Sequence, residues 1–312
     1  MTTTTLRTAD AWYVQTASGA ARIDTDATTT AQLLDDREAI TAAMARTDTV
    51  AVENLTLLSP VTAPCRLVAQ MTNFASHVTD AGMNPNTIPL TFFRKASGSI
   101  SAPDADVVRP AHVHLLDYEV EIGIVIGREV PVGAEITHEN LADHVAGLVV
   151  ANDVSARDVQ LPQTQFYEAK SYPTFTPVGP ALVLLDRDEL KRFTDLRLRL
   201  WVNGEPRQDM TVADMIYSPV QALQALARFQ HLDAGDLLLT GTPVGTALSA
   251  PSAPIAFLAS LLPPALRWKV FLGRQRKNPK YLQDGDVIEA TVATDDGAID
   301  LGQQRTTVRW TG

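Results

Sequence analysis

The chain has 312 residues, of which 45% are hydrophobic and 20% charged, and its formal net charge is −10. The length suits one large domain or a large domain with a small appendage, and the composition is that of a globular protein. The acidic balance argues against nucleic acid as a partner because phosphates would be repelled.

Cysteine content and hydrophobic runs limit the protein class further. Cys65 is the single cysteine, which excludes an internal disulfide framework and a Cys-rich metal site. We expect it to be a small buried apolar residue and not a nucleophile. Residues 1–7 contain no apolar signal core, and no run approaches the ~18 apolar residues of a membrane span. We therefore expect a cytoplasmic protein with no membrane partner.

Residues 1–63 are expected to form a small N-terminal domain. Segments 11–14 and 20–23 predict a hairpin that turns at Ser18 and Gly19. Residues 30–44 predict one helix that begins after a threonine cap. Pro60 and Pro64 mark the passage into a larger domain, residues 64–312.

Residues 116–127 predict a strand with two unequal faces. Tyr118, Val120, Ile122, Ile124 and Ile126 alternate on one face and form a core. Glu119 and Glu121 share the other face, roughly 7 Å apart, and Gly123 beside them leaves room. A second apolar strand, residues 147–152, ends at Asp153.

Three carboxylates so placed would repel one another unless a cation lay between them. Glu119, Glu121 and Asp153 supply hard oxygen ligands that suit Mg²⁺, Mn²⁺ or Ca²⁺. On its own, a Glu-x-Glu strand also fits a solvated sheet face.

Three segments in order resemble signature blocks of the fumarylacetoacetate hydrolase family. They are Asp-Tyr-Glu-Val-Glu at 117–121, Asn-Asp-Val-Ser-Ala-Arg-Asp-Val-Gln at 152–160 and Thr-Gly-Thr-Pro-Val-Gly at 240–245. The similarity covers roughly residues 64–312. It implies a mixed β-sandwich roll, an all-oxygen metal site and a homodimer. This agrees with the mostly β, α+β architecture that short strands and frequent turns predict.

His77 and Asp80 are candidates for a catalytic dyad. They lie three residues apart, which on one helical turn places the carboxylate beside the imidazole and favours a general base. The family has a similar segment, in which the acidic residue is usually glutamate. A histidine near a helix start is also often structural, and His112 and His114 are expected to be structural.

The remaining candidates are expected to neutralise and position substrate oxygens. Arg157 and Gln160 can present a guanidinium and an amide on one helical turn, although an exposed helix face is the alternative for Gln160. The loop around Gly241 and Thr242 suits a carboxylate or enolate oxygen, and by resemblance Thr242 contacts the substrate carboxylate. The resemblance also places Lys95 and Lys170 by the site; Lys95 also fits a solvated strand end.

Residues 247–283 are the segment least similar to the family. They contain no acidic residue, and an apolar run at 255–262 precedes six basic residues. The family members that hydrolyse fumarylacetoacetate have a glutamate here that helps activate water, and this sequence has no match for it. We expect an insertion that forms a lid or a subunit contact.

The function expected from these residues is metal-dependent hydrolysis of a carbon–carbon bond in a 1,3-diketone or acylpyruvate-type acid. The metal would bind the substrate's paired oxygens, and His77 would deprotonate water. The alternative is decarboxylation, isomerisation or hydration of a 2-oxo acid through the same enolate. A non-catalytic protein that binds metal and a small carboxylate is a third alternative.

Overall fold

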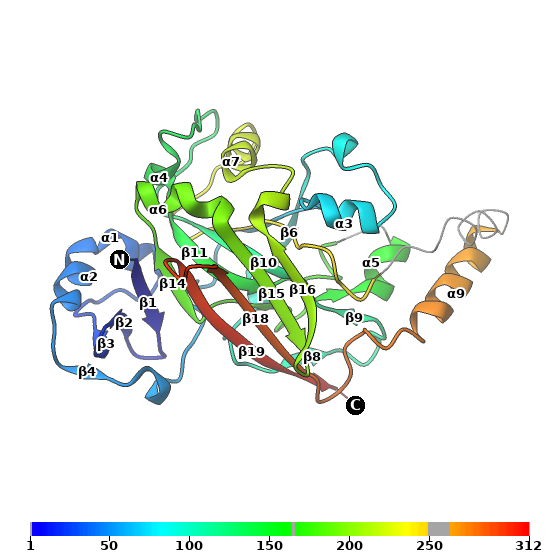
Figure 1. The fold of residues 1–312 in the computed structure, drawn as a ribbon, viewed down its shortest axis with the longest axis horizontal. Coiled ribbons are helices and arrows are strands. Elements are labelled where there is room, and N and C mark those ends of the chain that lie inside the picture. The colour runs from blue at the N-terminus through cyan, green and yellow to red at the C-terminus, as the bar shows by residue number, and fades with distance from the viewer. Residues whose placement is uncertain (1, 164–165, 249–262, 312) are drawn as a thin grey trace.

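A computed structural model describes residues 2–163, 166–248 and 263–311 (Figure 1). The expected mostly β, α+β fold is confirmed, and two large sheets dominate it. The larger sheet has the strand order β4-β3-β2-β1-β14-β11-β10-β17-β5-β6, and its strands pair antiparallel except for the parallel pair of β5 and β17. Its strands are β1 Thr3–Arg7, β2 Trp12–Thr16, β3 Gly19–Arg22, β4 Thr49–Val50, β5 Leu67–Gln70, β6 Phe92–Lys95, β10 Val120–Ile126, β11 Val145–Asn152, β14 Ala181–Leu184 and β17 Leu237–Leu239.

The second sheet has the order β16-β15-β18-β19-β8, and two short strand pairs, β9 with β12 and β7 with β13, lie apart from both sheets. These strands are β7 Ile100–Ser101, β8 Val107–Arg109, β9 Leu116–Asp117, β12 Ser155–Ala156, β13 Thr176–Pro177, β15 Leu196–Val202, β16 Glu205–Thr211, β18 Val287–Thr294 and β19 Asp300–Trp310.

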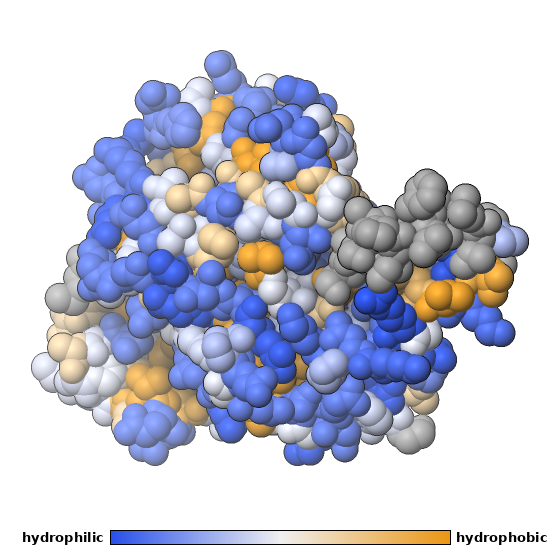
Figure 2. Space-filling model, turned by 45° about the vertical axis from the view of Figure 1, so that its right-hand side comes forward, coloured by the Kyte–Doolittle hydropathy of each residue, from blue (hydrophilic) through white to orange (hydrophobic). Residues whose placement is uncertain are grey.

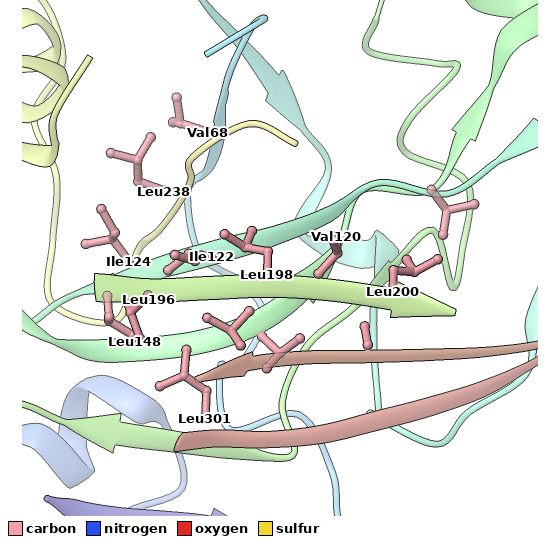
Figure 3. Close-up of a cluster of buried hydrophobic side chains, with 14 of the residues drawn as sticks. Val68, Val120, Ile122, Ile124, Leu148, Leu196, Leu198, Leu200, Leu238 and Leu301 are labelled. Carbon is pink, nitrogen blue, oxygen red and sulfur yellow. The ribbon is translucent and has the colours of Figure 1, made fainter. Parts of the chain in front are cut away.

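The main core fills the space between the two large sheets. Figure 3 shows Val120, Ile122 and Ile124 of β10 lying against leucines 196, 198 and 200 of β15. The opposite face of β10 is buried as well, because Val125 belongs to a separate apolar cluster with Val149 and Leu237. The alternation predicted for residues 116–127 is therefore confirmed, although the strand is divided into β9 and β10.

The helices are short and lie around the sheets (Figure 1). They are α1 Thr30–Asp35, α2 Arg37–Met44, α3 Ala75–Asp80, α4 Leu141–His144, α5 Arg157–Gln163, α6 Arg187–Leu190, α7 Pro219–Ala227 and α9 Pro264–Gln275. None in the described chain is long and apolar enough to cross a membrane.

The prediction of a single helix at residues 30–44 is wrong, because the helix is interrupted at Asp36. This residue leaves helical geometry at φ −97° and ψ 54°, and its carboxylate accepts a hydrogen bond from the amide of Ala39. Asp36 thus ends α1 and caps α2. Short polar side chains such as aspartate interrupt helices in this way because they bond to nearby backbone amides in non-helical conformations. The expected threonine cap is confirmed at Thr29.

The N-terminal strands extend the larger sheet. The predicted hairpin is formed by β2 and β3, and β1 pairs antiparallel with β14. Residues 1–63 therefore contribute strands to the same sheet that contains β10 and β11.

Helix α9 projects from the body of the molecule (Figure 1). It holds the first part of the basic cluster of the expected insertion, and its Leu266 and Val270 are exposed. Figure 2 shows hydrophobic colour on this projecting part of an otherwise mainly hydrophilic face. The expected apolar run at 255–262 lies outside the described residues.

Candidate active site

The three predicted metal ligands meet where β10 and β11 pair. Val120 is opposite Asn152 in the antiparallel register, so Glu119 and Glu121 lie beside the residue that follows β11. The amide of Asp153 donates to the carbonyl of Glu119 at 2.8 Å, and the amide of Glu119 donates to the Asn152 side chain at 2.9 Å. One carboxylate oxygen each from Glu119, Glu121 and Asp153 lies within 4.8 Å of the others.

The sequence suggested that Gly123 makes room for the glutamates, but the structure gives this glycine a different role. A Cβ atom on it would lie 2.5 Å from Val149 and 2.8 Å from Leu237. The glycine is needed for close packing of β10 against its two neighbouring strands.

Three buried cations surround the carboxylates. Lys170 donates to both Glu119 and Asp153. Lys95 donates to Asp153 and, at 3.0 Å, to the carbonyl of Phe175. Arg157 donates to Glu119, to Asp117 at 2.8 Å and to the Gln160 side chain at 2.8 Å. The structure therefore brings three predicted site residues, Lys95, Lys170 and Arg157, into contact with the proposed ligands, and Gln160 into contact with Arg157.

Glu119 and Glu121 differ in their surroundings. Burial raises the pKa of a carboxyl group, but in Glu119 the charges of Arg157 and Lys170 outweigh burial and hold the pKa below its ordinary value. In Glu121, burial and the charges of Asp153 and Glu119 raise the pKa well above its ordinary value.

Glu121 is the proposed ligand whose negative charge is not balanced by a lysine or arginine of the described chain. In the described chain no lysine or arginine forms an ion pair with it, and its carboxylate accepts a hydrogen bond from the amide of Gly241 at 2.7 Å. A hard divalent cation among the three carboxylates would supply the missing positive charge, and oxygen ligands are those that such cations prefer. The donor set therefore fits Mg²⁺, Mn²⁺ or Ca²⁺.

The two lysines also differ. Burial lowers the pKa of Lys95, and Asp153 only partly offsets this effect. Burial opposes charge on Lys170 too, but Asp153 and Glu119 outweigh it and raise its pKa. Lys170 is consequently a fixed ammonium between two carboxylates. Lys95 lies beneath the site rather than on the wall of the cavity described below, so its ammonium orients Asp153.

The expected pairing of His77 and Asp80 is absent from the described structure. His77 belongs to the wall of the cavity that holds the three carboxylates. Its Nδ1 atom is buried and has no hydrogen-bond partner among the described residues. Asp80 is exposed and lines a separate hollow with Ser76 and Asp214. Although His77 and Asp80 are three residues apart on the six-residue helix α3, their side chains line different hollows.

The loop after β17 is held against β10. Gly241 has φ +85°, and its amide binds Glu121. Thr242 donates its hydroxyl to the carbonyl of Val120 at 2.9 Å and accepts from Gln208 at 2.9 Å. Both residues border the cavity, but the Thr242 hydroxyl already has partners inside the protein.

The site opens into a cavity of about 710 Å³, which is in the range of small-molecule sites. Gln70 on β5 lies in the cavity wall and is 3% exposed, and its Nε2 atom has no hydrogen-bond partner among the described residues. Sequence reasoning missed this residue, since a glutamine at the end of an apolar strand carries no distinctive pattern. A ligand oxygen is the partner that such an amide lacks.

Asp117 was also missed as a functional residue, although it begins the first signature block. It is fully buried, pairs with Arg157, and accepts hydrogen bonds from the amides of Ala247 and Leu248 at 2.8 and 3.1 Å. Asp117 thereby fixes both the guanidinium and the start of the insertion. His112 and His114 are exposed and lie outside the three-carboxylate cluster.

Together, the sheets and the site define a mostly β protein with a buried acidic centre that is suited to a divalent cation. Residues 66–309 match the family model described as fumarylacetoacetate (FAA) hydrolase C-terminal, and the chain belongs to this family.

Curated relatives include mitochondrial oxaloacetate tautomerases. The chain is 30% identical to that of Xenopus laevis over 241 residues, which cover 77% of this chain and 66% of the relative. It is 34% identical to the oxaloacetate tautomerase YisK of Bacillus subtilis over 177 residues, 57% of this chain and 48% of that protein. The aligned part of the chain thus spans just under two thirds of the length of the first of these relatives and about half of the second.

Several solved structures resemble the whole chain, and two of them share more than a quarter of its residues. A probable 2-hydroxyhepta-2,4-diene-1,7-dioate isomerase from Mycobacterium abscessus has a TM-score of 0.76 and 29% identity, with both chains fully covered. A fumarylacetoacetate hydrolase from Exiguobacterium antarcticum has a TM-score of 0.72 and 26% identity, again with full coverage of both chains.

Proposed function

We propose that this protein catalyses tautomerisation or isomerisation of a 2-oxo acid through its enolate, with a divalent cation at Glu119, Glu121 and Asp153. Such a cation acts as a Lewis acid toward the oxygen that becomes negative in the enolate. Supporting this proposal, curated relatives are named oxaloacetate tautomerases and a solved relative is named as a probable isomerase. The substrate is a small carboxylate.

The observation that carries the proposal is that His77 and Asp80 line different hollows and that no hydrogen bond joins them in the described structure. Hydrolysis needs a general base that is oriented to activate water, and no carboxylate orients this imidazole in the described structure. Moving a proton at a carbon next to a carbonyl needs only a neutral base that faces the substrate. Burial lowers the pKa of His77, which keeps the ring neutral at pH 7.

The other residues have roles that follow from their partners. The ammonium of Lys170, held by Glu119 and Asp153, stabilises negative charge that develops on the substrate oxygens. Arg157 is locked by Asp117 and Glu119 and contributes fixed positive charge. Gln70 has a free amide that can donate to a substrate oxygen. His77 takes up the proton from the carbon and returns it.

Hydrolysis of a carbon–carbon bond in an acylpyruvate-type acid is the second candidate. It is favoured by the fold and 26% identity shared with the fumarylacetoacetate hydrolase, together with the presence of His77 and Lys170. In that reaction His77 would deprotonate water rather than the substrate carbon.

A product analysis separates the two functions. The purified protein with Mg²⁺ is given acetylpyruvate and a series of 2-oxo acids, enol absorbance is followed, and products are identified by mass. We expect faster interconversion of enol and keto forms with no change of mass. Stoichiometric formation of acetate and pyruvate from acetylpyruvate would establish hydrolysis and contradict the proposal.

A further inference from the structure

The cavity has a charged end and an apolar end, and the two meet at Lys170. The Lys170 ammonium lies 5.1 Å from the centre of the Phe93 ring, and the rings of Phe93 and Phe166 are 5.2 Å apart. The aromatic pair is therefore the part of the wall that directly adjoins the acidic centre. Further apolar lining is provided by Met71, Met83, Ile88 and Phe92.

The apolar end has no lysine or arginine. Among the described residues of the cavity wall, Arg157 and Lys170 are the only lysine or arginine side chains. Both lie at the acidic centre, where each pairs with two carboxylates. The sequence at 164–165 and 249–262, which the structure does not describe, contains no lysine, arginine or histidine. The described wall of the cavity thus has no lysine or arginine to neutralise a second carboxylate away from the centre; its other polar side chains, such as Gln70, Thr72 and Thr91, carry no charge.

Placing an unpaired carboxylate against such a wall is unfavourable, because the charge loses water without gaining a partner. An apolar substituent in the same place buries its surface, and aromatic rings pack well against Phe93 and Phe166. The part of the cavity wall beyond the carboxylates is therefore suited to a hydrophobic group and not to an acid.

We propose that the substrate is a 2-oxo monocarboxylic acid whose third carbon bears an apolar, preferably aromatic, group. This inference rests on the proposed function and narrows its substrate class. It separates this chain from relatives that are named for oxaloacetate or a heptadienedioate, both of which are dicarboxylic acids. The 2-oxo acid end lies at the acidic centre, and the apolar group lies along Phe93 and Phe166.

The test compares phenylpyruvate with oxaloacetate as enol substrates under the same Mg²⁺ concentration. We expect kcat/KM for phenylpyruvate to exceed that for oxaloacetate by about 10-fold or more, since the unpaired second charge is rejected. A preference for oxaloacetate would overturn the substrate class and leave the proposed function standing. Acceleration of neither substrate would contradict the proposed function itself.

An exposed position allows the charge to be supplied without disturbing the core. Met83 lines the cavity and is 46% exposed, so Met83→Arg places a cation at the apolar end. We expect kcat/KM for oxaloacetate to rise by about 10-fold and that for phenylpyruvate to fall. Met44→Arg is the matched control, because Met44 is 44% exposed and lies on α2 outside the cavity. An equal gain in both variants would reflect net charge and overturn the inference.

Discussion

His77 is the residue on which the choice between proton transfer and hydrolysis depends. Its imidazole borders the cavity, whereas Asp80 is exposed and borders another hollow. His77→Ala should lower kcat by about 10²- to 10⁴-fold, the usual contribution of a general acid–base group. Asp80→Ala should change kcat by no more than about two-fold. Steady-state kinetics on the best substrate tests both, and an equally severe loss in Asp80→Ala would restore the dyad.

The pH dependence follows from the same residue. Burial lowers the pKa of His77 below the ordinary value of 6.5, so the neutral base is present above that lowered pKa and is lost as pH falls through it. We therefore expect kcat/KM to be flat between pH 7 and 8 and to decline only below pH 6.5. A pH profile with its acid limb above pH 7 would contradict a buried neutral base.

At Glu121 we expect metal binding to be coupled to proton release. Burial and two neighbouring carboxylates raise its pKa well above the ordinary range, so without a cation it tends to hold a proton. A bound cation favours the charged form, and the proton leaves. We expect Mg²⁺ affinity to increase with pH and calorimetry in buffers of different ionisation enthalpy to detect proton release. Glu121→Gln should weaken Mg²⁺ binding and remove that release; unchanged release in the variant would exclude Glu121.

At the level of elements, strand β10 positions the site because both of its faces are buried. Gly123 lets β11 and β17 approach it, with Val149 and Leu237 in the space that a side chain would need. Gly123→Ala should lower the free energy of unfolding by about 1–3 kcal/mol through overpacking. Gly98→Ala is the control, since a Cβ there meets open space, and it should stay within about 0.5 kcal/mol. Urea unfolding measures both, and equal stability would show that β10 can repack.

The sequence predicted β10 and β11 well, since alternation of apolar residues is a local pattern that packing reinforces. The same alternation placed Glu119 and Glu121 on one face, and the strand end placed Asp153 beside them. Local patterns failed where a side chain competed with the backbone, as at Asp36, and where two helix residues had to face one direction, as at His77 and Asp80. Gly123 was placed correctly, but its packing role depends on strands far away in sequence.

Across the whole molecule, the site depends on contacts between distant segments. Lys95 of β6, Lys170 and Asp153 meet although they lie far apart in the chain. The family resemblance pointed to both lysines, but no periodicity in the sequence could show that Lys95 lies beneath the carboxylates or that Asp117 locks Arg157. Gln70 likewise acquires its role only when β5 pairs with β17 beside β10.

The most direct test of the account is solvent hydrogen exchange at the carbon next to the oxo group. The protein, Mg²⁺ and phenylpyruvate are mixed in D₂O, and deuterium at the third carbon is followed by nuclear magnetic resonance. We predict exchange faster than with Mg²⁺ alone, intact substrate carbon, and loss of the acceleration after exhaustive chelation or in Glu121→Gln. Carbon–carbon cleavage at the rate of exchange would contradict isomerisation as the reaction. Full acceleration after chelation would contradict a metal-dependent site at Glu119, Glu121 and Asp153.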